Sequence, residues 1–126
     1  MILIDTSAWV DFFRGRGSAT ARVDRALEDN TATVCGPVLT ELHRGLHPSE
    51  RQTVLKLLTA CHQLEQPPEL WRDAGELGYT LGRKGVTAKT FDLLIASYAL
   101  FHQLPLLTTD KDFRAIQRAG VGLHLA

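Results

Sequence analysis

Long apolar runs are absent from this 126-residue chain, and cysteine is scarce. No stretch comes close to the roughly 20 apolar residues that a membrane-spanning helix needs. The first residues contain neither a basic segment nor a small-residue cleavage motif, so we expect no signal peptide and a cytoplasmic location. Cys35 and Cys61 are too few and too far apart for a disulfide framework or a cysteine-rich zinc site, and we expect both to be reduced core residues.

The chain also lacks internal repeats and an excess of either charge. Its 14 basic and 14 acidic side chains cancel, which by itself predicts no nucleic-acid partner. The prediction changes if four acids gather at one site. Ten acids and 14 basic side chains then remain, and the rest of the chain is net positive. The length and the hydrophobic content of 44% suit one compact domain over residues 1–126.

Short apolar runs alternate with helical patterns along the whole chain. We expect strands at residues 2–4, 33–35, 63–66 and 105–108, and an edge strand at 121–125. We expect seven helices. The first runs from residue 6 or 7 to about 14, and the next three begin at residues 18, 37 and 49. The last three cover about 69–84, 90–103 and 112–119. Strands separated by helices predict a parallel sheet that is covered on both faces, in an α/β fold.

Four acidic residues fall at the ends of these elements. Asp5 ends the first strand, Glu41 lies one turn inside the helix after the second, and Asp110 follows the PLLT strand. Asp92 lies in the first turn of the helix that leads to that strand. Ligands of open parallel sheets bind beyond the carboxyl ends of the strands, so all four carboxylates can converge at one edge.

Each acid also has a structural interpretation, because acids near helix N-termini fill caps and complement the helix dipole. This interpretation is strongest for Asp110 in TTDKDF and weakest for Glu41, which lies too far along its helix to be a cap. Carboxylates that are packed together repel one another and need a compensating cation. A set of oxygen ligands alone favours Mg²⁺ or Mn²⁺ over zinc or copper.

Four motifs, in this order and at these separations, resemble the PIN-domain ribonucleases, and most closely the VapC-type toxins of bacterial toxin–antitoxin pairs. They are IDTSAWVDFFRG, TELHRGL, KTFDLLIASYAL and LPLLTTDKDF, and together they cover essentially the whole chain. The resemblance implies a three-layer α/β/α fold with a mainly parallel central sheet of four to five strands. It also implies an endoribonuclease that depends on Mg²⁺ or Mn²⁺ and hydrolyses RNA phosphodiester bonds.

The resemblance also assigns roles to residues. The family's acidic positions fall on Asp5, Glu41, Asp92 and Asp110, and a further, less regular acidic position falls on Asp112. The family also has small hydroxyl residues near the metal, and these positions fall on Thr6, Ser7 and Thr108. Asp5 and Asp92 are the first choices for direct metal contact, while Glu41 and Asp110 bind directly or through water. The presence of all four acids argues against a degenerate, inactive copy.

An RNA substrate needs cations around this acidic centre. Five basic side chains are candidates to contact RNA, and each has the alternative of being a solvated surface charge: Arg14, Arg16, Lys84, Lys89 and Lys111.

The family resemblance further implies a homodimer and a cognate antitoxin whose C-terminal segment lies along a groove by the active site. Trp9, Phe12 and Phe13 on the early helices are candidates to line such a groove, with core packing as the alternative. Trp71 and Tyr79 suit packing or an interface better than base stacking.

Other functions are weighed against this one. His43 and His47 have a metal-binding spacing, but Gly45 and Pro48 disfavour a continuous helix there. A receiver-like phosphoacceptor domain needs an acidic pair after the first strand and a lysine after a late strand, and the chain has neither. A catalytically silent RNA- or protein-binding module, a nuclease that acts on DNA and an RNA-processing nuclease without a toxin role stay open.

Overall fold

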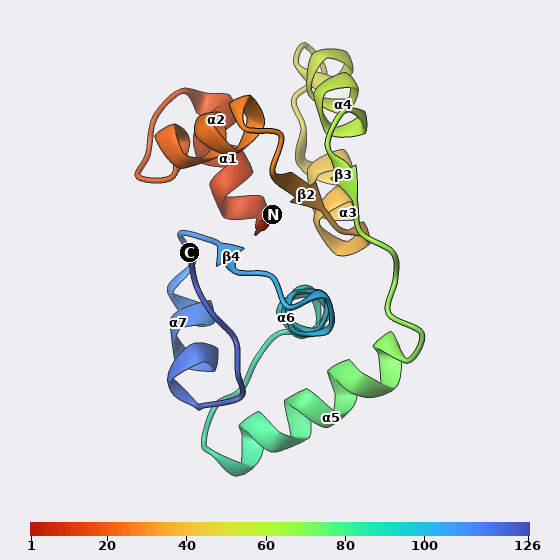
Figure 1. The fold of residues 1–126 in the computed structure, drawn as a ribbon, viewed down its shortest axis with the longest axis vertical. Helices are drawn as coiled ribbons and strands as arrows, with labels where there is room; N and C mark the ends of the chain where they lie inside the picture. Colours follow the sequence, from red (N-terminus) through yellow and green to blue (C-terminus); the bar gives the residue numbers. More distant parts are fainter.

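The computed structural model describes residues 1–126 as four short strands and seven helices (Figure 1). In chain order they are β1 (Ile2–Ile4), α1 (Thr6–Arg14), α2 (Thr20–Glu28), β2 (Ala32–Val34), α3 (Gly36–Gly45), α4 (Arg51–Thr59), β3 (His62–Gln63), α5 (Leu70–Arg83), α6 (Thr90–His102), β4 (Leu106–Leu107) and α7 (Lys111–Arg118). None of the helices is both long and apolar enough to cross a lipid bilayer.

All four strands pair in parallel, in the order β3-β2-β1-β4. The first three strands step in one direction across the sheet, and the chain then returns to place β4 on the free side of β1. Since parallel crossovers are right-handed, this reversal puts the later helices on the opposite face from the earlier ones. The strand order therefore changes direction between β1 and β4, which is where α/β sheets open a crevice for ligands.

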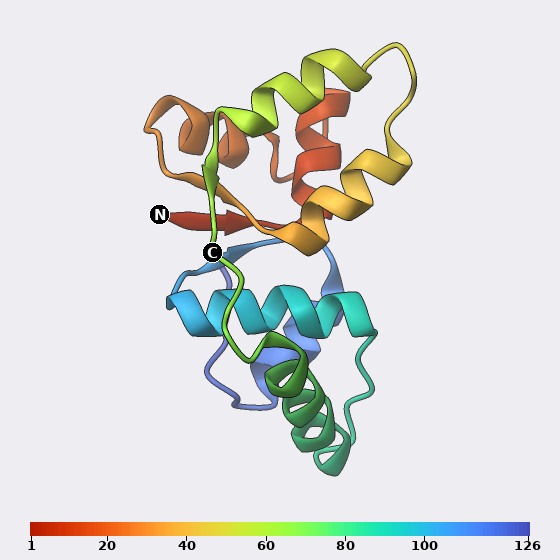
Figure 2. The same cartoon turned by 90° about the vertical axis from the view of Figure 1, so that its right-hand side faces the viewer.

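The helices form a layer on each side of this sheet, which confirms the predicted α/β/α architecture. Helices α1 to α4 lie on one side, and α5 to α7 lie on the other (Figures 1 and 2). Helix α6 runs next to the sheet, and α5 packs on the far side of α6 (Figure 2). The N-termini of α1 and α3, which follow β1 and β2 directly, start at the carboxyl edge of the sheet.

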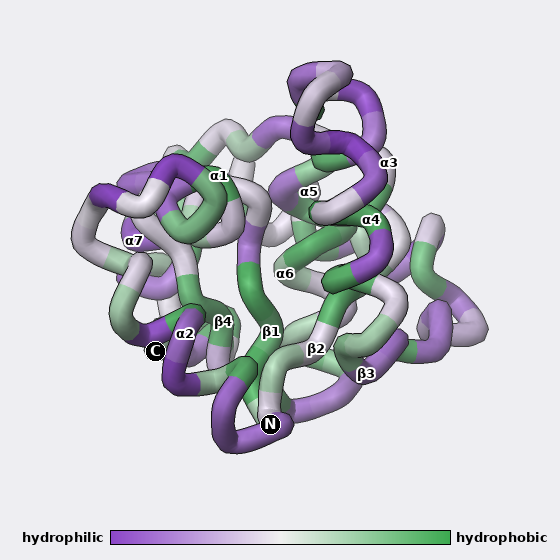
Figure 3. Tube along the Cα trace, turned by 90° about the horizontal axis from the view of Figure 1, so that it is seen from above, coloured by the Kyte–Doolittle hydropathy of each residue, from purple (hydrophilic) through white to green (hydrophobic).

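The core lies between the sheet and its helices, and the apolar strand β1 runs through its centre (Figure 3). Trp9 is fully buried and stacks on Phe13 with ring centroids 5.7 Å apart. Trp9 therefore belongs to the core and not to a groove, whereas Phe12 and Phe13 are only half-buried. The packing interpretation of Trp71 and Tyr79 is wrong, because these α5 side chains are 70% and 68% exposed.

Two predicted strands differ from the observed ones by more than one residue at an end, whereas β2 and β4 lie within one residue of their predicted bounds. Pairing of the third strand covers His62 and Gln63 instead of residues 63–66, because the short β2 offers register partners only to these two residues. The segment 121–125 makes a single parallel bridge, between Leu106 and Leu125, and forms no regular strand. Gly122 has φ of +92°, which is incompatible with extended backbone and interrupts that segment.

The loop between α1 and α2 is held by Asp11. Its carboxylate accepts a hydrogen bond from the Ala19 amide, 3.3 Å away, and its carbonyl accepts one from the Thr20 hydroxyl. These contacts hold the turn before α2, which begins at Thr20 and not at Ser18 as the sequence predicts. Gly17 has φ of +111° and lies directly against the Asp11 carboxylate, so this position has no room for a side chain.

Two glycine substitutions test this description of the backbone. Gly17→Ala should lower the free energy of unfolding by about 1–3 kcal/mol, because it strains φ and displaces Asp11. The matched change Gly75→Ala should raise it by about 0.5–1 kcal/mol, since Gly75 lies inside α5 with open space around it. Urea unfolding measures both, and an equal effect of the two substitutions would contradict the proposed loop geometry.

Candidate active site

Asp5 occupies the N-cap position of α1 without capping it. Its side chain accepts no hydrogen bond from the helix amides and is only 4% exposed. The Oδ2 atom accepts hydrogen bonds from the Ser7 hydroxyl at 2.7 Å and the Thr108 hydroxyl at 2.8 Å. The bonds orient the buried carboxylate and leave Oδ1 without a partner within the chain.

The two hydroxyls that hold Asp5 are themselves held by the backbone after β4. Ser7 Oγ accepts from the Thr109 amide and Thr108 Oγ1 accepts from the Asp110 amide, both at 3.0 Å. Each hydroxyl has one proton and donates it to Asp5, so the 3.1 Å approach between Ser7 and Thr108 is a contact and not a further bond. The network joins the end of β1 to the end of β4.

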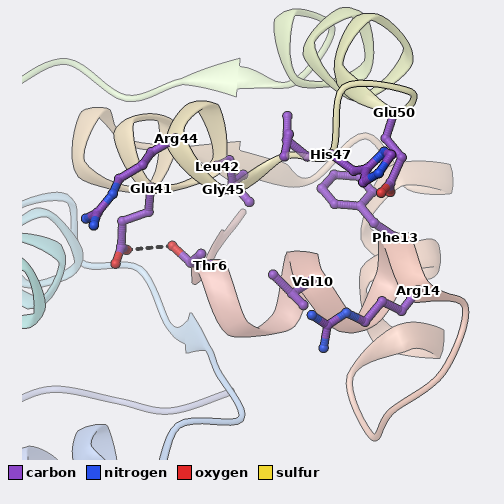
Figure 4. A pocket seen from close by; sticks show the side chains of 11 residues that line it. Thr6, Val10, Phe13, Arg14, Glu41, Leu42, Arg44, Gly45, His47 and Glu50 are labelled. Atoms are coloured by element: carbon purple, nitrogen blue, oxygen red, sulfur yellow. Dashed lines mark hydrogen bonds between the residues drawn. The ribbon is translucent and has the colours of Figure 1, made fainter.

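Glu41 lies on the second turn of α3 and faces the start of α1. Its Oε1 accepts a hydrogen bond of 2.7 Å from the Thr6 hydroxyl (Figure 4). The side chain is half-buried, and Thr6 is the first residue of α1. The sequence places Glu41 too far along the helix for a cap, and the structure shows it instead pointing at the segment that follows Asp5.

Three further aspartates form a cluster at the N-termini of α6 and α7. One carboxylate oxygen from each of Asp92, Asp110 and Asp112 lies within 4.8 Å of the others. Asp110 also caps α7, since its Oδ1 accepts a hydrogen bond of 2.9 Å from the Asp112 amide. The capping interpretation of Asp110 and its placement in the acidic cluster are therefore both correct, and they use different parts of the same side chain.

The negative charges act on one another across the whole edge. Burial and the charges of Asp110, Asp5 and Asp112 raise the pKa of Asp92 from 3.8 to about 6, against the opposing effect of Lys89. Burial is also the main cause that raises the pKa of the Cys35 thiol to about 12, with contributions from Asp5 and Glu41. All five acids therefore lie close enough together for their charges to affect the pKa values of groups at this edge.

This donor set fits a hard divalent cation. All of the clustered ligand atoms are carboxylate oxygens, and like charges raise the pKa of Asp92, so a bound cation relieves the repulsion. Imidazole ligands are not part of the site. Helix α3 ends at Gly45, so His43 and His47 do not share a helix face, and His47 Nδ1 instead lies 2.7 Å from the Ser49 hydroxyl.

The candidate RNA-binding cations are distributed unevenly. Lys89 lies at the acidic edge, with Nζ 3.9 Å from Asp112 Oδ2, and the exposed Lys111 adjoins Asp110. Lys84 is not brought to the site, because its Nζ donates to the Ala119 carbonyl, at the opposite end of α7 from Asp110. Arg14 lines a groove that begins at Thr6 and Glu41, whereas Arg16 is exposed in the loop after α1.

Arg44 lines the same groove as Arg14 and is a candidate that the sequence motifs did not single out. Arg44 follows Glu41 by three residues on α3, and residues three apart are neighbours on a helix surface. That spacing is the signal that points to Arg44 in the sequence.

The raised pKa of Asp92 predicts how the stability of the metal-free chain depends on pH. Because the folded-state pKa lies above 3.8, the ionised form destabilises the fold, and this penalty grows from about pH 4 to its full value above about pH 6. Asp92→Asn should remove it and stabilise the chain at pH 8 by about 1 kcal/mol, a value that allows for solvent screening of a half-exposed group.

The measurement is chemical unfolding of both chains in chelator at pH 4 and pH 8. The two stabilities should agree more closely at pH 4, where the carboxyl group is protonated in the folded state and about half protonated in the unfolded state, so that only a small part of the penalty is present. A constant difference between the chains at both pH values would mean that burial and the neighbouring charges do not raise the pKa of Asp92.

Comparisons with known proteins agree with this fold. The family model described as "PIN domain" matches residues 2–119. Ribonuclease VapC11 of Mycobacterium tuberculosis is 35% identical over 124 residues, which cover 94% of this chain and 92% of that protein. VapC ribonuclease Mb1587 of Mycobacterium bovis matches equally well.

Solved structures show the same architecture. VapBC2 of Rickettsia felis, bound to a promoter DNA fragment, superposes with a TM-score of 0.80 at 26% identity, over 100% of this chain and 98% of the other. DNA-bound VapBC of Salmonella typhimurium has a TM-score of 0.76 with the same coverage, and at 19% identity it supports the fold alone. On the family match and the curated relatives, the chain belongs to the PIN-domain family and, within it, to the VapC ribonucleases.

Proposed function

We propose that this protein is a divalent-metal-dependent endoribonuclease and the toxin of a toxin–antitoxin pair. The observation that carries the proposal is the convergence of carboxylates from separate segments at the carboxyl edge of the sheet. Four of the five acids come from regions of the chain that are far apart in sequence, and they meet where the strand order reverses. The family membership supports a ribonuclease rather than a DNA-specific enzyme.

Asp5 and Asp92 would hold the metal, together with Asp110 and, directly or through water, Glu41 and Asp112. Mg²⁺ or Mn²⁺, when bound, polarises the scissile phosphate and lowers the pKa of a bound water. The chain supplies the orientation: Ser7 and Thr108 fix the Asp5 carboxylate, and outer hydrogen bonds of this kind commonly control the ligand geometry of metal sites.

Other side chains act on the substrate or on the remaining acid. Thr6 fixes Glu41 through its 2.7 Å hydrogen bond, so that the Glu41 carboxylate cannot rotate freely away from the site. Lys89, at the rim of the cluster, is a cation available to a phosphate oxygen at that side. Hydrolysis in which water attacks phosphorus and the 3′ oxygen leaves would give 5′-phosphate and 3′-hydroxyl ends.

The proposed antitoxin would occupy the surface between α1 and α4. A hollow of about 370 Å³ there is lined by half-buried Phe12 and Phe13 and by Val54 and Leu57. It adjoins the groove that leads to Glu41, since both are lined by Phe13. The VapBC complexes and a toxin–antitoxin complex from Klebsiella pneumoniae share this fold, which supports a protein partner for this chain.

Cleavage of RNA tests the proposed activity. Wild-type protein with Mg²⁺ or Mn²⁺ should cut structured RNAs, and chelator should abolish cutting. Asp5→Asn and Asp92→Asn should each lower the rate by roughly 100-fold or more, since even outer partners of metal ligands contribute 10–100-fold. Asp24→Asn is the matched control, because Asp24 is an exposed carboxylate on α2. Equal cleavage by all four proteins would indicate a contaminating nuclease and remove the support for this mechanism.

We also propose a homodimer that forms through the exposed side of α5. Trp71 and Tyr79 lie about two turns apart on α5, and both aromatic rings are mostly exposed.

Size-exclusion chromatography with light scattering tests the dimer. Tyr79→Arg should shift the protein to monomer, because it places a charge within the apolar contact. Thr80→Arg is the control, since Thr80 is an exposed neighbour one position along α5. A wild-type protein that is monomeric at high concentration, or a Tyr79→Arg protein that stays dimeric, would rule out this interface.

A further inference from the structure

A groove of about 520 Å³ runs between α1 and α3 and opens at the acidic edge. Thr6 and Glu41, which are hydrogen-bonded to each other, line one end of it (Figure 4). Phe13, His47 and Glu50 line the other end (Figure 4). Because Glu41 is one of the proposed site residues, the groove is continuous with the place where a phosphodiester would be cut.

Two arginines line this groove from opposite walls, Arg44 from α3 and Arg14 from α1. Figure 4 shows the Arg44 guanidinium on the same side of α3 as the Glu41 carboxylate. Both side chains are exposed, and the structure records no ion pair or hydrogen bond for either guanidinium. An exposed guanidinium keeps its five donors in a planar fork that matches a phosphate group.

Charge distinguishes the possible occupants of the groove. Its acids are Glu41, which belongs to the proposed metal site, and Glu50 at the far end. Once a divalent cation offsets Glu41, the two arginines outnumber the one remaining acid. A polyanion then fits the groove, and the half-buried apolar side chains of Val10 and Leu46 on its walls can pack against the sugars.

We propose that this groove binds the sugar–phosphate backbone of the RNA strand next to the cleaved bond, with Arg44 and Arg14 as the phosphate-binding residues. The assignment of RNA rests on the proposed ribonuclease function. The groove proposal adds to that function the path of the RNA strand, which leaves the acidic centre on the side opposite Lys89. An antitoxin segment that enters the same groove would then inhibit the enzyme by displacing the strand as well as by reaching the acids.

Binding measured apart from cleavage tests the proposal. A labelled single-stranded RNA of about a dozen nucleotides is titrated with the cleavage-deficient Asp92→Asn protein in Mg²⁺, at several salt concentrations. Adding Arg44→Ala or Arg14→Ala should raise Kd by about 10-fold, and each should lower the slope of log K against log salt by roughly 0.7. Arg22→Ala is the matched control, since Arg22 is an exposed arginine beside Met1 and Ile2, at the opposite edge of the sheet.

Kinetics of the cleaving chain give a second readout. Arg44→Ala should raise KM by about 10-fold and change kcat by less than about twofold, because Arg44 binds the strand away from the reacting phosphate. Arg44→Lys should recover part of the affinity, since it keeps the charge and loses the fork.

The outcomes separate this proposal from the proposed function. An Arg44→Ala protein that binds RNA with unchanged Kd and salt slope would overturn the groove assignment, even if the wild-type chain cleaves RNA. The groove assignment would also be overturned if Arg44→Ala weakened the binding of a protein partner and left RNA binding unchanged. Arginine-dependent RNA binding without metal-dependent cleavage would support the groove and reject the nuclease.

Discussion

The geometry of the site depends on one buried carboxylate. A buried carboxylate costs folding free energy unless hydrogen bonds compensate it, and for Asp5 these come from Ser7 and Thr108. Thr108 is 103 residues away in the chain, so the interaction ties the ends of the neighbouring strands β1 and β4 together. The same bonds that stabilise the fold leave one Asp5 oxygen free of partners, which suits a metal ligand.

The strand order explains why the remaining acids gather around Asp5. Strand β4 lies next to β1 because the chain reverses its direction across the sheet, and this brings the segment with Asp110 beside the end of β1. Helix α6 precedes β4, so its N-terminus with Asp92 points to the same edge. Helix α3 follows β2 directly and delivers Glu41 from the other side. Right-handed crossovers thus assemble a site that no single segment contains.

Accumulated negative charge connects the structure to its proposed chemistry. Burial, together with the charges of Asp110, Asp5 and Asp112, raises the pKa of Asp92, so ionising this carboxyl group in the metal-free fold costs free energy. A divalent cation turns this repulsion into binding free energy. The cation also offsets the acids of the site. Because the net charge of the chain is zero, the basic side chains outnumber the acids that remain outside the site. Cations on both flanks, Lys89 on one and Arg44 on the other, are then positioned for a polyanion.

The sequence by itself determined the α/β class, most element positions and the set of acids, because these follow from local periodicity and from the ends of apolar runs. It left open whether Asp5 and Asp110 are caps, and only the structure shows that Asp5 is not a cap and that Asp110 is one. It likewise could not place Trp9 in the core or Arg44 in a groove. Burial and the surroundings of a side chain depend on which distant segments pack against it, and that is decided by the tertiary arrangement of strands and helices rather than by neighbours in the chain.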